Sequence, residues 1–214
     1  MVSLNEMMKG AWIEGEGVTG DWVPGDKFVD QLADLMVELH SSPYTGPDKK
    51  KFPAERDIAD LIAWDDKDDF TKQAIDEYFD LEHHWRGCLL HGDLWGQNIL
   101  VDEEGNLNGL RDWEAISVGD PNWDFRMIRR WLGLELLDQL IFKYNCSMDI
   151  NLNKKTIMTY NKISLCHSIR IRKERGLLRH DKYFVIQRLE ESKRIFPECL
   201  PLDWKPTADS IAES

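Results

Sequence analysis

The sequence predicts an α+β fold that is mainly helical and carries one small β-hairpin. Apolar residues recur at helical spacing in the first third of the chain and again after Pro121, which predicts amphipathic helices in both parts. Between them, short apolar runs at 88–90, 98–102 and 107–113 are typical of strands. With 214 residues, 42% of them hydrophobic, the chain can bury one sizeable core.

The predicted elements follow one another along the chain with short connections. Residues 1–25 are rich in glycine and acidic residues, so we expect a lead-in segment there and one lobe over 26–214. Asp26 is expected to be the N-cap of the first helix, which Ser41–Pro43 ends. Further helices are expected at Pro53–Trp64, Phe70–Leu81, Pro121–Leu140, Lys155–Arg172 and Tyr183–Ile195.

Asn98 and Asp112 are predicted to face each other across the hairpin, because their midpoint is Gly105, inside the turn at 103–106. Direct cross-strand partners stand about 4.5–5.5 Å apart at Cβ, so both side-chain oxygens could reach one cation. Mg²⁺ takes oxygen ligands, typically one or two protein groups plus substrate phosphates. A magnesium site is therefore expected here. Asp93, in the loop before the hairpin, could face the metal-bound phosphate and orient or deprotonate an acceptor hydroxyl.

His91, Asp93 and Asn98 form an H-x-D-x-x-x-x-N pattern that resembles the catalytic loop of protein kinases and of the aminoglycoside phosphotransferase family. The H-G-D-L form of this loop points to the second family. Residues 112–114 (D-W-E) resemble the family's metal-binding I-D-W-E segment, and residues 119–125 resemble its G-D-P-x-x-D-[LF] continuation. Order and spacing agree over some 35 residues, so the chain is similar to this family across its C-terminal lobe.

The resemblance implies a protein-kinase-like C-terminal lobe with the hairpin at its catalytic cleft. It implies that Asp93 is the catalytic base, that Asn98 and Asp112 bind Mg²⁺, and that His91 and Asp120 support the two loops structurally. The implied reaction transfers a phosphoryl group from ATP, or another nucleoside triphosphate, to a hydroxyl of a small-molecule substrate. The sequence does not identify that substrate.

The family's N-terminal nucleotide lobe has no counterpart in the sequence. That lobe supplies a strand-borne lysine for the nucleotide phosphates. Its hinge would fall near Glu6–Ile13, and we expect the isolated lobe to be an impaired kinase unless a second chain supplies the missing part. Gly15–Gly20 spells G-x-G-x-x-G, but without a strand before it or a helix opening directly after it, a flexible linker is expected. Arg111, where the family has an apolar residue, could bring positive charge to the phosphates or form a simple ion pair.

A non-catalytic alternative stays open at this stage. The chain could be a binding or regulatory remnant of a kinase-like fold that covers its cleft by forming a homodimer. In that case, an apolar edge around Ile99, Leu110 and the N-terminal segment would be exposed and would need cover. Taken singly, each candidate site residue also has a structural explanation, such as a turn or cap for Asp93.

Composition excludes several classes of partner. The net charge of −12, with no concentrated basic block, argues against nucleic acid. No run approaches the roughly 20 apolar residues of a membrane span, so no membrane partner is expected. The four cysteines are widely spaced and form no C-x-x-C pair, which is typical of reduced thiols in a cytoplasmic protein. The acidic balance would suit a cationic substrate, but a solvated acidic surface explains it equally well.

Overall fold

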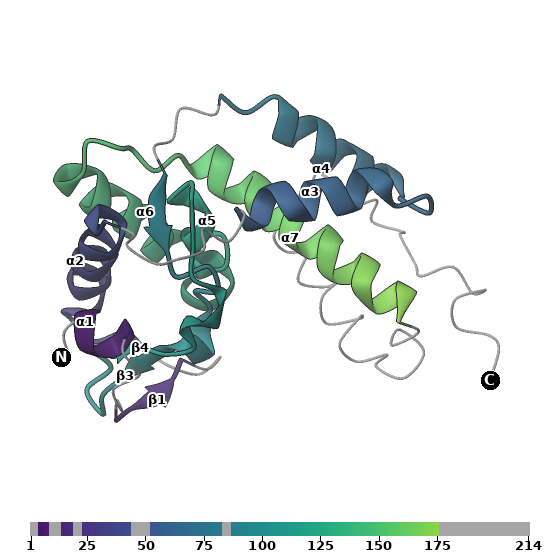
Figure 1. Ribbon diagram of the computed structural model, residues 1–214. Coiled ribbons are helices and arrows are strands. Elements are labelled where there is room, and N and C mark those ends of the chain that lie inside the picture. Colours follow the sequence, from purple (N-terminus) through teal and green to yellow (C-terminus); the bar gives the residue numbers. More distant parts are fainter. Residues whose placement is uncertain (1–3, 9–13, 19–22, 44–51, 83–86, 176–214) are drawn as a thin grey trace.

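The computed structural model describes residues 4–8, 14–18, 23–43, 52–82 and 87–175, and its fold is mainly helical with two small antiparallel sheets (Figure 1). The helices are α1 (Leu4–Met8), α2 (Phe28–Ser41), α3 (Pro53–Ala63), α4 (Asp69–Phe79), α5 (Asn122–Phe125), α6 (Ile128–Ser147) and α7 (Lys154–Glu174). The strands are β1 (Glu16–Gly17), β2 (Cys88–Leu90), β3 (Ile99–Val101), β4 (Leu107–Leu110) and β5 (Ser117–Gly119). The predicted mainly helical α+β class is thus confirmed. The helix expected at 183–195 lies outside the described residues.

Local sequence explains several of the helix ends. Asp68 caps α4 by accepting a hydrogen bond from the Thr71 amide at 2.8 Å, and Asn153 caps α7 in the same way. Proline at the first position of α3 has no N–H to leave unsatisfied. Asp26, however, is not a cap. The N-cap residue of α2 is Lys27, which makes no side-chain capping bond.

Two hydrophobic cores lie on either side of β2. One is formed mainly by α1, α2, β3, β4 and α6, and the other by α3, α4 and α7 (Figure 1). Leu89 belongs to the first core, whereas Cys88 and Leu90 belong to the second, because successive side chains of a strand point to opposite sides. The loop that follows β2 therefore leaves from the seam between the two cores.

The predicted hairpin forms from β3 and β4, but its register differs from the expected one. Ile99 pairs with Leu110, and the Arg111 amide donates to the Asn98 carbonyl at 3.0 Å. Arg111, not Asp112, therefore lies opposite Asn98, so the predicted pairing is wrong. The turn is centred on Glu104 and not on Gly105, because the Asp102 amide donates to the Asn106 carbonyl. That centre alone would place Leu110 opposite Asn98, and a β-bulge on β4 then moves the pairing by one residue, to Arg111.

The glycine-rich segment expected to be a linker contributes a strand to the sheet, and its residues 19 and 20 lie outside the described part. Glu16 and Gly17 form β1, which pairs antiparallel with β3 and makes a three-stranded sheet in the order β1-β3-β4. A Cβ on Gly17 would lie 2.9 Å from the backbone of Gln97, so close backbone approach requires glycine here. Of the expected hinge, residues 9–13 lie outside the described part, and Glu6 belongs to α1.

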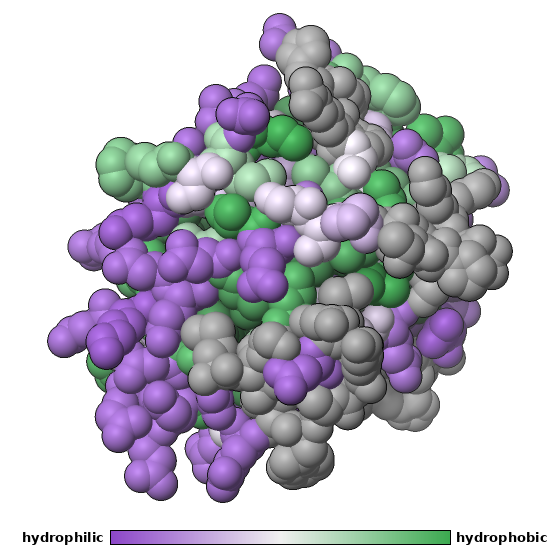
Figure 2. Space-filling view, turned by 60° about the vertical axis from the view of Figure 1, so that its left-hand side comes forward, coloured by the Kyte–Doolittle hydropathy of each residue, from purple (hydrophilic) through white to green (hydrophobic). Residues whose placement is uncertain are grey.

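The apolar edge expected to be exposed is buried. Ile99 and Leu110 are both fully buried, and Leu4, Met7 and Val18 of the N-terminal segment join the same core. Figure 2 shows one face of the molecule, with hydrophilic residues gathered on its left and a hydrophobic area near its centre. The edge that would have called for a homodimer is therefore covered by the chain's own N-terminal segment.

Sequence reasoning also missed two features. The strand β5, which pairs antiparallel with β2, was not predicted because its three residues are too few to show a periodic pattern. The helix α6 is kinked at Gly133, whose φ of 78° and ψ of 179° are not helical.

None of the described helices has the length and hydrophobicity that crossing a bilayer requires. Cys88, Cys146 and Cys166 are free thiols.

Burial along α6 predicts a sharp contrast between two leucines. Leu137 is fully buried and Leu134 is 42% exposed. Leu137→Ala should lower the free energy of unfolding by about 2–5 kcal/mol, because it leaves a cavity in the core. Leu134→Ala, the matched control, should cost under about 1 kcal/mol. Urea denaturation measures both, and equal losses would contradict the assigned packing.

Candidate active site

Asp93 and Asn98 lie side by side in the loop that joins β2 to β3. The Asn98 amide nitrogen donates to the Asp93 carbonyl at 2.9 Å and to its carboxylate at 3.3 Å. Asn98 is buried, and Asp93 is half-buried. Because the NH₂ group of Asn98 is directed at Asp93, its side-chain oxygen is oriented away from Asp93 and can serve as a ligand for a cation.

The imidazole of His91 connects this loop to the end of β4. Its Nδ1 accepts from the Asp93 amide at 3.3 Å, so its Nε2 carries the proton and donates to the Arg111 carbonyl at 2.9 Å. Burial lowers the pKa of His91, against the opposing charges of Asp124, Asp93 and Asp112 nearby. A neutral ring therefore holds the backbone before Asp112 next to the backbone of Asp93.

Asp112 has an unusual backbone conformation. Its φ of 63° and ψ of 67° are left-handed, and among the described residues no other non-glycine residue has positive φ. Aspartate tolerates this region better than most side chains, but the conformation still carries strain. The turn ends β4 and starts the short 3₁₀ helix Trp113–Ala115, and it leaves the Asp112 carboxylate exposed.

Asp124, in α5, anchors the start of the loop. Its carboxylate accepts from the amides of His91 and Gly92, both at 2.8 Å, and lies 3.2 Å from Nε2 of His40 in α2. Full burial raises the pKa of this carboxyl, but the bond from His40 and the other donors outweigh burial, and the net pKa is lowered. His40 is itself 2.8 Å from the hydroxyl of Tyr144 in α6.

Gly92 makes the sharp turn that presents Asp93. Its φ is +84°, and a Cβ there would lie 2.1 Å from the carbonyl of Ala115, so only glycine fits. The Gly92 carbonyl accepts from the indole N–H of Trp123 and from the guanidinium of Arg126, each at 3.2 Å. The turn is thus held on its amide side by Asp124 and on its carbonyl side by these two residues.

Asp120 lies on a different part of the site. Its carboxylate accepts from the backbone and side chain of Asn122 and from the Tyr160 hydroxyl at 2.8 Å. It therefore connects the start of α5 to α7, and among the described residues it forms no hydrogen bond with Asp93, Asn98 or Asp112.

The side chain of Arg111 is exposed and forms no ion pair with a described residue, so the simple ion pair considered above is not found among the described residues.

A cavity of about 580 Å³ opens beside Asp93. Its walls come from α3, from the Gly92 turn, from the segment around β5, from α5 and from α7. A volume of this size is typical of small-molecule sites. Lining residues that carry charge or hydroxyl groups are Arg56, Asp57, Asp93, Glu114, Ser117, Arg126, Ser164, His167 and Ser168.

Residues 6–145 match the phosphotransferase enzyme family. The chain belongs to this family. It is 29% identical over 134 residues to the uncharacterized protein YcbJ of Bacillus subtilis, and 36% identical over 61 residues to viomycin phosphotransferase of Streptomyces vinaceus. These regions cover 57% and 27% of this phosphotransferase-family chain, but only 44% and 21% of the relatives. The chain thus spans less than half the length of these curated relatives.

The fold of this family member is kinase-like. It matches the structure of the GDP complex of aminoglycoside 2'-phosphotransferase-IIIa with a TM-score of 0.68, over 88% of this chain and 70% of that one. Sequence identity is 15%, so the likeness concerns the fold and not the substrate. The resemblance to the aminoglycoside phosphotransferases that the motifs predicted is therefore confirmed.

The chemistry of the predicted donor set is compatible with a magnesium ion. Asn98 and Asp112 offer hard oxygens, and the described residues contain no ready-made cluster of three or more histidine, cysteine or acidic ligands. Few protein ligands are what Mg²⁺ requires when it keeps waters and phosphate oxygens. Sequence reasoning did not assign a role to Asp124, which lies within the 119–125 motif, or to Arg126. The G-D-P-x-x-D motif contained a signal for Asp124, whereas none identified Arg126.

The lowered pKa of Asp124 predicts acid sensitivity. A carboxyl whose folded pKa lies below its ordinary value of 3.8 adds stability above that value, and the contribution is lost as pH falls through the folded pKa. Asp124→Asn should lower the free energy of unfolding at neutral pH by about 1–3 kcal/mol. It should also flatten the decline in stability as pH falls below about 4, as urea titrations would measure.

The surface carboxylate Asp138, which pairs with Lys154, offers a matched control. Asp138→Asn should change stability by less than about 1 kcal/mol, because exposed ion pairs contribute little. An Asp124→Asn protein with the wild-type pH profile would show that the carboxylate does not stabilise the loop.

Proposed function

We propose that this chain is the catalytic lobe of a phosphotransferase that uses Mg²⁺ and ATP, or another nucleoside triphosphate, to phosphorylate a hydroxyl of a small molecule. One observation carries the proposal. Asp93 lines the cavity while its carboxylate contacts Asn98, so an acceptor hydroxyl and a cation could both be served at one place. Membership of the phosphotransferase enzyme family supports the reaction class.

Asp93 would orient the acceptor hydroxyl and receive its proton. The acceptor oxygen then forms a bond to the terminal phosphorus of the nucleotide, and the bond from that phosphorus to the nucleoside diphosphate breaks. Asn98 and Asp112 would hold Mg²⁺, which supplies charge neutralisation at the phosphates when bound. The hydrogen bond from His91 to the Arg111 carbonyl keeps the two metal-binding positions in register with Asp93.

The nucleotide side of the site needs additional positive charge. We propose that a second chain or a further lobe supplies the residues that contact the nucleotide phosphates, and that the 214-residue chain alone transfers phosphate slowly. Several phosphate charges must be compensated in the transition state, and one cation leaves much of that stabilisation absent. The exposed side chain of Arg111, next to Asp112, is proposed to contribute part of it.

Calorimetric titration with magnesium-ATP tests the nucleotide and metal side. The wild type should bind in a magnesium-dependent manner, and Asp112→Ala should weaken binding by about tenfold or more because a carboxylate ligand is lost. Arg111→Ala should weaken binding as well, and unchanged affinity would remove its proposed role. If neither the wild type nor Asp112→Ala binds in a metal-dependent way, the kinase assignment fails.

The role of Asp93 is tested by turnover. Release of nucleoside diphosphate should rise when the true acceptor class is added, and Asp93→Asn should reduce the acceptor-dependent rate by about 10²–10⁴-fold. Glu103→Gln, an exposed change in the hairpin turn, is the matched control and should leave the rate unaltered. Equal rates in Asp93→Asn and wild type would rule out a catalytic carboxylate at this position.

A further inference from the structure

Arg126 is a buried arginine without a carboxylate partner. It is 6% exposed, its guanidinium lies 4.0 Å from the ring centre of Trp123, and no described carboxylate forms an ion pair with it. Its two hydrogen bonds go to main-chain carbonyls, of Trp123 at 3.0 Å and of Gly92 at 3.2 Å. Burial lowers the pKa of Arg126, while Asp124 and other acids counteract this from beyond ion-pair distance. A buried cation in such a place is costly unless an anion joins it.

Two polar atoms in the cavity wall are unsatisfied. Nε of Arg126 and Oγ of Ser117 are both buried without a hydrogen-bond partner, and both residues line the cavity beside Asp93. Buried polar atoms in folded proteins are nearly always hydrogen-bonded. Donors from α5 and from β5 therefore remain available at one cavity, and a ligand that accepts hydrogen bonds would satisfy them.

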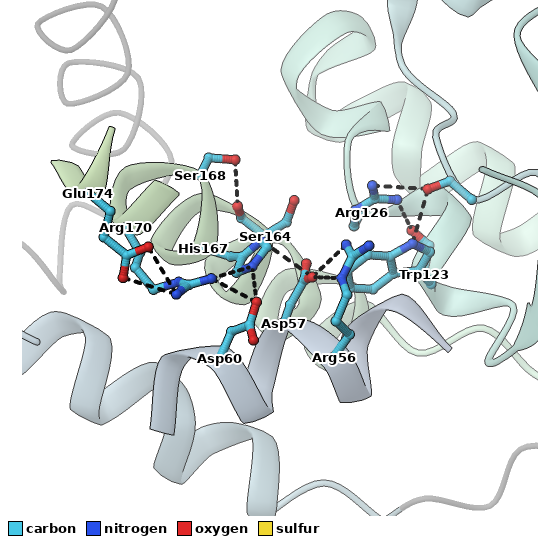
Figure 3. A network of polar contacts seen from close by, with 11 residues as sticks. Arg56, Asp57, Asp60, Trp123, Arg126, Ser164, His167, Ser168, Arg170 and Glu174 are labelled. Carbon is cyan, nitrogen blue, oxygen red and sulfur yellow. Dashed lines mark hydrogen bonds and ion pairs between the residues drawn. The ribbon is translucent and has the colours of Figure 1, made fainter. Parts of the chain in front are cut away.

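The charges on the opposite wall are already compensated. Arg56 donates to one oxygen of Asp57 at 2.7 and 3.0 Å, and Nδ1 of His167 lies 3.3 Å from the same oxygen. Nε2 of His167 is 2.9 Å from Asp60, which also binds Arg170 (Figure 3). This network of ion pairs between α3 and α7 is separate from Arg126, which lies beside Trp123 in the same view.

We infer that the acceptor carries an oxyanion, a carboxylate or a phosphate, which Arg126 and Ser117 bind while its hydroxyl meets Asp93. The inference rests on the proposed function, since it describes the acceptor of that same site. Arg126 binds the carbonyl of Gly92, the residue before Asp93, so the oxyanion and the reacting hydroxyl must lie within one compact molecule. Hydroxy acids and sugar phosphates have this chemistry, whereas cationic aminosugars do not.

Binding to the wild-type chain gives the first test. Gluconate, sorbitol and glucosamine are matched polyhydroxyl probes with an anionic, a neutral and a cationic character, and calorimetry compares their affinities. Gluconate should bind about tenfold or more tightly than sorbitol, because bonds to a charged partner are the stronger ones. The affinity for glucose 6-phosphate is compared with that for glucose, and inorganic phosphate is measured alone. These comparisons distinguish a preference for a phosphate from a preference for a carboxylate. Equal or tighter binding of sorbitol and glucosamine, with no preference for glucose 6-phosphate over glucose, would overturn the inference.

Variants then assign the preference to Arg126. Arg126→Gln should remove the preference for the anionic probe, and Ser117→Ala should reduce it. Arg126→Lys keeps the charge and should keep the preference for the anionic probe. Thermal unfolding shows whether Arg126→Gln folds, and Arg126→Lys is the variant to measure if it does not. Lys143→Gln, a change in a surface ion pair of α6, is the control and should have no effect. An unchanged preference in a folded Arg126→Gln protein would contradict the assignment.

The two proposals can fail separately. Asp93→Asn should slow transfer by about 10²–10⁴-fold but still bind gluconate, because the oxyanion site does not include that carboxylate. Transfer confined to neutral or cationic acceptors would overturn the anionic acceptor and leave the phosphotransferase proposal standing. Binding of the anionic probe that depends on Arg126, without phosphorylation of any acceptor, would leave the anion site standing and overturn the phosphotransferase proposal.

Discussion

The geometry of the site depends on one buried carboxylate. Asp124, in α5, accepts hydrogen bonds from the amides of His91 and Gly92, and it also contacts His40 of α2. The loop after β2 leaves the seam between two cores, where its amides would otherwise lack partners. Because a single acceptor binds both amides, the next residue, Asp93, is directed to the cavity and to Asn98.

The site separates charges by depth. The carboxylate of Asp112 is exposed, as a position for a hydrated cation and its phosphates requires, whereas the cation of Arg126 is buried in the cavity wall. Charges interact more strongly away from water, so we expect the buried arginine to influence the choice of ligand more than the acidic surface does. The net charge of −12 suits a cationic acceptor and a solvated acidic surface equally well, and the environment of Arg126 supports our inference of an anionic acceptor.

The N-terminal segment contributes to the site region as structure. Its strand β1 completes the sheet next to β3, and Val18 is buried against the same core as Ile99. A chain that covers its own sheet edge has less need of a partner for that purpose.

The left-handed turn at Asp112, which follows β4, is strained, and such strain is common where a side chain must be held for function.

The sequence by itself determined most of the long helices among the described residues, the presence of the hairpin and the family, because periodic burial and the motif from His91 to Phe125 are local properties of the chain. It could not determine the hairpin register, since the exact centre of the turn and a one-residue bulge leave hardly any trace in the pattern. Nor could it distinguish Arg126 from the other arginines. Only tertiary packing decides that this guanidinium is buried beside Trp123 with no ion-pair partner among the described carboxylates, because α5, the Gly92 turn and Ser117 are brought together by contacts distant in sequence.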